Sequence, residues 1–147
     1  MADTRIRDAS PASEERLRAT ECSVAKLRFR RPDVPAVRHF ARAFGVGVGM
    51  RSSRLSDFAL AASEAAACAV SHGPCAARMR LWTTGPRVCC EIRSDGILLG
   101  HGPHAVEQGD ADAMRRRLLE RICDHASVES GPYGITVSFS MTVALAD

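Results

Sequence analysis

Three side chains that could take part in chemistry recur at four-residue spacing near the middle of the chain: Glu64, Cys68 and His72. Residues four apart lie on one face of an α-helix, so a helix here would bring the three groups into one row. Cysteine and histidine at this spacing can bind zinc, and a histidine beside a cysteine can lower the thiol pKa and make the sulfur redox-sensitive. No Cys-x-x-Cys pair accompanies them, which favours a simpler interpretation of Cys68 as a buried, inert core residue.

The other groups with chemical potential do not form a motif. His101 and His104 lie in a glycine-rich segment and are interpreted as solvated loop histidines. Cys89 and Cys90 are adjacent, and because side chains alternate along a strand, at most one of them is expected to be buried. The sequence contains no Gly-x-Ser-x-Gly motif, no Walker loop and no evident Ser/His/Asp grouping.

The elements that must position these residues follow from hydrophobic periodicity and turn residues. Alternation predicts a strand from Cys22 to Pro32 and two hairpins, and helical spacing predicts three helices. The first helix is capped by Asp33 and stopped by Gly45 and Gly47, and the second opens at Ser56 or Asp57. One hairpin is expected to pair 77–83 with 88–93, and the other to pair 125–129 with 135–145. The second helix is expected to end at 73–74, and the third to span 112–124.

A long segment, 94–110, is rich in Gly, His, Pro and Asp and is predicted to be a functional or mobile loop. Residues 1–21 show no sustained period and are predicted to be a flexible tail before a domain over 22–147. The order strand, two helices, hairpin, loop, helix, hairpin predicts an α+β two-layer sandwich. Its sheet is expected to be mixed and mostly antiparallel, with the helices on one face.

Two strings carry a family resemblance: ASEAAACAVSHG over 62–73 and ESGPYGITVSF over 129–139. Together with the element order, they resemble the GHKL (Bergerat-fold) ATPases in their anti-sigma-factor serine-kinase branch. Members of that branch read approximately VSELVTNAVRHG and RSGPGGTTVRL. The resemblance covers about residues 22–142 and implies the histidine-kinase-like ATPase fold.

Residue by residue, the resemblance implies a degenerate ATP site. The family's helical general base corresponds to Glu64, whereas the asparagine that holds magnesium corresponds to Cys68, and a thiol is a poor ligand for this hard cation. The family's first glycine box is the motif Asp-x-Gly, and its glycine corresponds to Gly96. The adenine-binding aspartate falls on Ser94, and Asp95 lies one residue away, where only a bulge would bring it into the site.

The second glycine box and the last hairpin depart in the same way. The glycines that expose backbone N–H groups to phosphate correspond to Ala113 and Arg115, and the nearest glycine is Gly109. Arg115 is interpreted as an exposed helix arginine rather than an anion contact. The structural Gly134 is kept. The contact to adenine changes as well. The family's adenine-contacting threonine corresponds to Ile135, and the side chain of Thr136 is expected to point to the opposite face of the sheet.

Composition restricts the possible function classes. The 147 residues, 46% hydrophobic and 25% charged, are those of an ordinary globular domain, and no run is long and apolar enough to span a membrane. The tail lacks the apolar segment of a secretory signal, which indicates a cytoplasmic protein with reduced cysteines. A net charge of +3 does not predict nucleic-acid binding. The arginine clusters 28–31 and 115–117 are interpreted as a solvated strand edge and a solvated helix face.

These observations predict an anti-sigma-factor-like regulatory protein that acts by binding a protein, with ATP binding and kinase activity weak or lost. The implied partners are a sigma factor or an anti-anti-sigma protein, and a homodimer stays open. No cofactor is expected. The alternative is an active ATP-dependent serine/threonine kinase that phosphorylates an anti-anti-sigma protein. It would use ATP and magnesium, with Glu64 as base and Asp95 and Gly96 at the adenine.

Overall fold

The structure, a computed structural model, describes residues 24–71, 76–94, 105–131 and 134–143, with the backbone alone described for 105–110. Within these ranges the chain has an α+β fold of five strands, three α-helices and one 3-10 turn. In chain order the elements are β1 (Val24–Arg30), the 3-10 turn η1 (Arg31–Asp33), α2 (Val34–Gly47), α3 (Ser52–Ala69), β2 (Ala76–Thr84), β3 (Arg87–Ser94), α4 (Ala105–Ile122), β4 (His125–Gly131) and β5 (Gly134–Thr142).

The strands form one sheet in the order β1-β2-β3-β5-β4. Each of the four junctions between described strands is antiparallel, so the expectation of a mixed sheet is wrong. The helical crossover through α4 does join two strands that run in the same direction, β3 and β4. However, β5 lies between them and pairs with both, and no parallel ladder forms.

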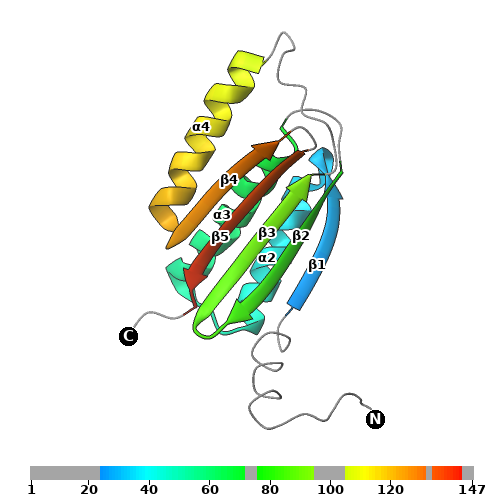
Figure 1. The fold of residues 1–147 in the computed structure, drawn as a ribbon. Coiled ribbons are helices and arrows are strands. Elements are labelled where there is room, and N and C mark those ends of the chain that lie inside the picture. The colour runs from blue at the N-terminus through cyan, green and yellow to red at the C-terminus, as the bar shows by residue number, and fades with distance from the viewer. Residues whose placement is uncertain (1–23, 72–75, 95–104, 132–133, 144–147) are drawn as a thin grey trace, which may run out of the picture.

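The helices make a second layer against the sheet (Figure 1). Helices α2 and α3 lie behind the strands in this view, and α4 runs beside β4, where it packs on α3 and β4. Alternate residues of the central strands point into the core between the layers. The buried set from β2, β3 and β5 is Ala77, Met79, Leu81, Val88, Cys90, Ile92, Ile135, Val137, Phe139 and Met141.

Helix α3 can lie close to the sheet because small residues cover its buried side. Ala61, Ala62, Ala65 and Ala66 have no solvent exposure and add little width to the helix. Near the start of the helix, Phe58 meets Phe139 of β5 edge to face, with ring centroids 5.9 Å apart and an interplanar angle of 63°. The rest of α3, which includes Glu64 and Cys68, is thereby held at a fixed height above β3 and β5.

Several predicted boundaries are wrong. Helix α2 continues past Gly45 and ends at Gly47, the second of the two predicted stops, and α3 begins at Ser52, before the predicted start. Helix α4 begins at Ala105, so the last six residues of the predicted loop are helical. These six residues have little apolar periodicity, which explains why the sequence pattern did not predict a helix there. The predicted tail over 1–21 and the segment 95–104 lie outside the described residues.

Candidate functional site

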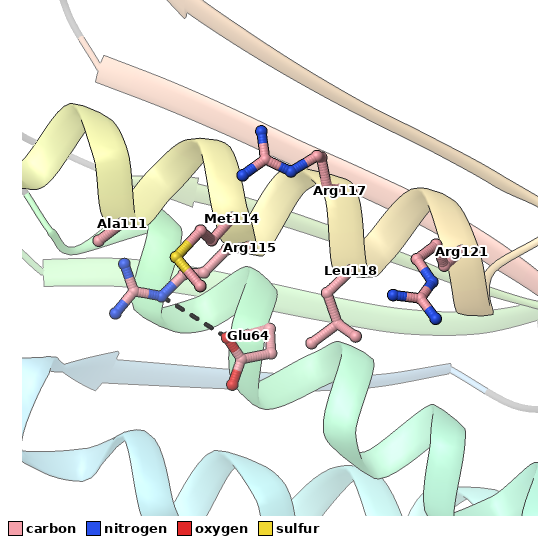
Figure 2. Close-up of a pocket in the computed structure, with 7 residues that line it drawn as sticks. All are labelled: Glu64, Ala111, Met114, Arg115, Arg117, Leu118 and Arg121. Carbon is pink, nitrogen blue, oxygen red and sulfur yellow. Dashed lines mark ion pairs between the residues drawn. The ribbon is translucent and has the colours of Figure 1, made fainter.

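The site begins with Glu64 on the exposed side of α3, where helix α4 crosses it (Figure 2). Arg115 of α4 points toward Glu64, with its Nε 3.6 Å from Glu64 Oε1. The same guanidinium donates from Nη1 to Asp112 Oδ1 at 3.2 Å. The position that the resemblance assigns to a general base is therefore held in an ion pair by a side chain from the facing helix.

A second contact joins α4 to Ser71, two residues beyond the end of α3. The Ser71 hydroxyl shares its one proton between Asp112 Oδ2 at 3.0 Å and the Cys68 carbonyl oxygen at 2.9 Å. Arg115 and Asp112 together thus bridge α4 to Glu64 and Ser71 at the end of α3. The interpretation of Arg115 as an exposed helix arginine is wrong, because its side chain is only 28% exposed and has two carboxylate partners.

Cys68 lies inside the core, one turn along α3 from Glu64. Only 2% of the residue is exposed, as the simpler interpretation of this cysteine predicts. Burial raises the pKa of the Cys68 thiol to about 11, and the nearby Asp112 carboxylate adds to the rise while Arg115 and Arg116 oppose it. At neutral pH the sulfur is therefore a protonated thiol. It fits neither a reactive thiolate nor a ligand for magnesium.

The two positions that the resemblance assigns to adenine recognition are bonded to each other. The backbone N–H of Ile135 donates to Ser94 Oγ at 2.8 Å, which ties the end of β3 to the start of β5. Both residues are buried on the helix side of the sheet. The serine hydroxyl is engaged by the protein's own backbone, and Ile135 presents only carbon where the family has a hydroxyl.

Thr136 and Gly134 have separate structural settings. Thr136 pairs with Arg93 and Glu129 across neighbouring strands and lies on the opposite face of the sheet from Ile135, as strand alternation requires. Gly134 has a φ of 146°, in the region that favours glycine, at the turn between β4 and β5. Several other candidates lie outside the described residues: Asp95, Gly96, His72, His101 and His104.

Arg115 lies between two hollows. The larger, of about 520 Å³, is an open groove between α3 and α4 lined by Glu64, Ala111, Met114, Arg115, Arg117, Leu118 and Arg121 (Figure 2). The smaller, of about 320 Å³, lies at the end of α3 and includes Arg31, Ser71 and Arg115. Arg31 donates to the carbonyls of Val70 and Ser71, so it caps α3 and is not part of a solvated strand edge.

The sequence did not predict the side-chain contacts that hold this site together. Ser71 and Asp112 are 41 residues apart in the chain, as are Ser94 and Ile135, so no local pattern connects them. The four cysteines described, Cys68, Cys89, Cys90 and Cys123, are free thiols, and of the adjacent pair only Cys90 is fully buried, as alternation predicts.

Two negative findings apply to the described part of the chain. It holds no cluster of three or more His, Cys, Asp or Glu side chains suited to a metal ion. None of its helices combines the length and apolar character needed to cross a membrane. In comparisons with known proteins, no family model and no curated sequence matches this chain.

Proposed function

We propose that this chain is an anti-sigma-factor-like regulatory protein on a Bergerat-type frame, which acts by binding a protein partner and whose nucleotide site is closed. The antiparallel sheet with helices packed against it is compatible with that frame. A fold does not specify an activity by itself, so the proposal depends on the side chains at the site.

The observation that carries the proposal is the Glu64–Arg115 ion pair. The resemblance implies glycines at this point that open the helix and expose backbone N–H groups to phosphate. Arg115 instead lies inside α4, which begins at Ala105, so the backbone N–H groups around it are bonded within the helix. The long arginine side chain instead reaches across to Glu64, 3.6 Å away, and to Asp112. A carboxylate in this pair is held by a cation and is not positioned to accept a proton from a substrate hydroxyl.

Two further contacts support a closed site. A magnesium ion bridging phosphates requires oxygen ligands, and the buried Cys68 thiol offers none. The Ser94 hydroxyl already accepts a hydrogen bond from the Ile135 N–H, so the described residue at the adenine position supplies a bonded hydroxyl where the family has a carboxylate. The residues present do not fit ATP with magnesium, and we derive no step through that cofactor.

The groove between α3 and α4 is the surface we assign to the partner. Met114 is 65% exposed and lies with Leu118 among three arginines, Arg115, Arg117 and Arg121. An apolar centre with a charged rim is typical of protein interfaces, and methionine adapts readily to a partner surface. The resemblance suggests a sigma factor or an anti-anti-sigma protein as the partner.

Calorimetric titration with ATP and magnesium tests the closed site. We expect no binding tighter than about millimolar, because each missing charged hydrogen bond costs roughly 1.5–3 kcal/mol and about 1.4 kcal/mol is a tenfold change in affinity. Micromolar affinity would instead support the active kinase.

Affinity capture from the source bacterium tests the partner. The chain should recover a sigma factor or an anti-anti-sigma protein without added nucleotide. Met114→Ala should weaken capture at least tenfold, in the range of an interface hot spot. Val46→Ala is the matched control, because Val46 is similarly exposed (59%) but lies on α2. Equal loss with both variants, or recovery that strictly requires ATP, would contradict the proposal.

A further inference from the structure

The face of the sheet opposite α2 and α3 carries no helix among the described elements, and Figure 1 looks directly onto it. Strand alternation points several cationic side chains to this face, and five exposed ones line a single hollow. They come from three neighbouring strands, β1, β2 and β3. We call them the basic face: Lys26, Arg28, Arg78, Arg80 and Arg93.

The strand register places like charges directly opposite one another. Arg28 pairs with Arg78, and Arg78 pairs in turn with Arg93, so three arginines form a row across the sheet. In the next row Lys26 pairs with Arg80. Directly opposed like charges destabilise a sheet, so fold stability supplies no reason for this arrangement.

Among the described residues of β1, β2 and β3, one carboxylate lies beside these cations. Glu91 of β3 is 3.6 Å from Arg80 Nη2 and 3.8 Å from Arg93 Nε, so two guanidinium groups share a single negative charge. A second carboxylate on this face, Glu129, is on the edge strand β4, beyond β5. The region over β1, β2 and β3 therefore keeps an excess of positive charge.

The basic face is concave and adjoins a second hollow. The five cations and Glu91 line a hollow of about 590 Å³. An adjoining hollow of about 400 Å³ shares Arg80 and Glu91 and adds Trp82 and three serines, Ser127, Ser138 and Ser140. Between the two, the Arg80 guanidinium lies over the Trp82 ring, 4.5 Å from its centroid. The stacked pair provides a planar cationic surface beside hydroxyl groups.

We propose that the basic face binds the backbone of a single-stranded nucleic acid, with the Arg80–Trp82 pair as a stacking surface for a base. Arginine matches phosphate with two parallel hydrogen bonds, and four of the five cations are arginines. Grooves that track a single strand combine such cations with aromatic rings on which bases stack. This inference does not rest on the proposed function, because it concerns the other face of the sheet.

The chemistry of the face favours nucleic acid over an acidic protein. Protein interfaces have an apolar core, whereas nucleic-acid interfaces are more polar and much more positive. Among the described residues, the exposed large apolar side chains are Val24, Val46 and Met114, and only Val24, at the start of β1, lies on this face. A broad sheet also does not fit the major groove of a duplex, which admits a helix or a two-stranded ribbon.

The test is fluorescence anisotropy of the full chain with labelled dT12, in parallel with a 12-base-pair duplex and with polyglutamate as the acidic-polypeptide probe. We expect a dissociation constant of about micromolar for dT12 at 50 mM KCl, with weaker binding of the other two probes. Each phosphate neutralised on a single strand contributes a slope of about −0.7 in log K against log salt, so three to four contacts give about −2 to −3. Trp82 is the only tryptophan, and its fluorescence should be quenched over the same concentration range.

Charge substitutions locate the site. Arg28→Ser with Arg93→Ser should weaken dT12 binding about tenfold and reduce the salt slope by about 1.4. The matched control, Arg38→Ser with Arg42→Ser, removes the same charge from exposed positions on α2, on the other side of the sheet, and should change affinity less than threefold. Glu91→Gln releases Arg80 and Arg93 and should tighten binding several-fold. Thermal melts check that each variant folds.

Four outcomes would overturn the proposal. Equal losses in the two double variants would show that binding follows net charge and not this face. Polyglutamate binding as tightly as dT12 would assign the face to an acidic polypeptide, and duplex binding as tightly as dT12 would remove the preference for a single strand. Slower or weaker binding by Glu91→Gln would also contradict it, because that change only removes negative charge.

Discussion

Cys68 is buried and protonated, and these two properties decide what a substitution there can do. Only 2% of Cys68 is exposed, and burial is the main reason that the pKa of its thiol is raised to about 11. The neighbouring Glu64 is engaged by Arg115 from α4. A change at position 68 therefore acts inside the packed core and not at an exposed position.

We expect Cys68→Asn to destabilise the fold without restoring ATP turnover. The asparagine amide would be buried beside apolar neighbours, and an unsatisfied buried polar group costs about 1–3 kcal/mol. The other departures, at Ser94, Arg115 and Ile135, would remain. Urea denaturation followed by circular dichroism measures the first effect, and an ATPase assay measures the second.

The informative comparison is with a combined variant, Cys68→Asn, Ser94→Asp, Arg115→Gly and Ile135→Thr, checked for folding in the same way. Because several contacts are missing, one alone leaves affinity orders of magnitude short if the losses even partly add. Robust hydrolysis by the single variant would mean that the assignment of the other three positions is wrong. Asp95, Gly109 and Thr136 would then be the residues at work.

At the scale of elements, the packing of α2 on α3 depends on a glycine inside a helix. A Cβ atom added at Gly45 would lie 2.6 Å from Leu55 Cδ1 and 3.3 Å from both Met50 Sδ and Phe58 Cδ2. The next glycine, Gly47, has no atom within 4 Å of such a Cβ. Both lie within α2, so they form a matched pair with opposite packing environments.

We expect Gly47→Ala to raise the free energy of unfolding by up to about 1 kcal/mol, because alanine favours the helix and meets no neighbour. Gly45→Ala has the same backbone gain but overpacks the α2–α3 contact, which typically costs about 1–3 kcal/mol. It should therefore be neutral or destabilising. Urea midpoints of the two variants against the parent chain measure the difference, and equal stabilisation by both would contradict the close approach.

The element order could be predicted from the sequence because each element has its own local signal. Period-two alternation identifies the hairpins and also sends Thr136 and Ile135 to opposite faces. Gly45 shows the limit: its sequence context reads as a helix stop, yet its small size serves contact with Leu55, which only the packed structure reveals. The Glu64–Arg115 pair likewise depends on how α4 docks on α3.

At the scale of the whole molecule, the net charge of +3 conceals how charge is distributed. Residues far apart in the sequence, such as Arg28, Arg78 and Arg93, become neighbours only through the strand register. The sequence interpretation of 28–31 as one solvated cluster missed this. Arg28 joins the basic face, whereas Arg31 turns away to cap α3.

The composition also determines how stability depends on alkaline pH. The chain has 20 basic residues, of which only Lys26 is a lysine, and one tyrosine. Arginine keeps its proton, so few groups other than thiols titrate between pH 9 and 11. Burial raises the pKa of Cys68 to about 11 and of Cys123 to about 12, and it raises the pKa of Cys90 well above its ordinary value of 9.0.

We expect the free energy of unfolding to fall steeply above pH 9. Thiols in the unfolded chain ionise near pH 9 while the buried ones stay protonated, so the stabilisation is complete below pH 9 and is lost as pH rises toward the folded-state pKa values. Each buried thiol contributes about 1.4 kcal/mol per pH unit in this window. Cys90→Ala should therefore lose less stability than the parent chain between pH 8 and pH 10, even if it is less stable at pH 8.

Cys89→Ala is the matched control, because Cys89 is adjacent but only partly buried. Thermal melts under reducing conditions measure both, and an unchanged pH dependence in Cys90→Ala would show that the buried thiols do not set the alkaline limit.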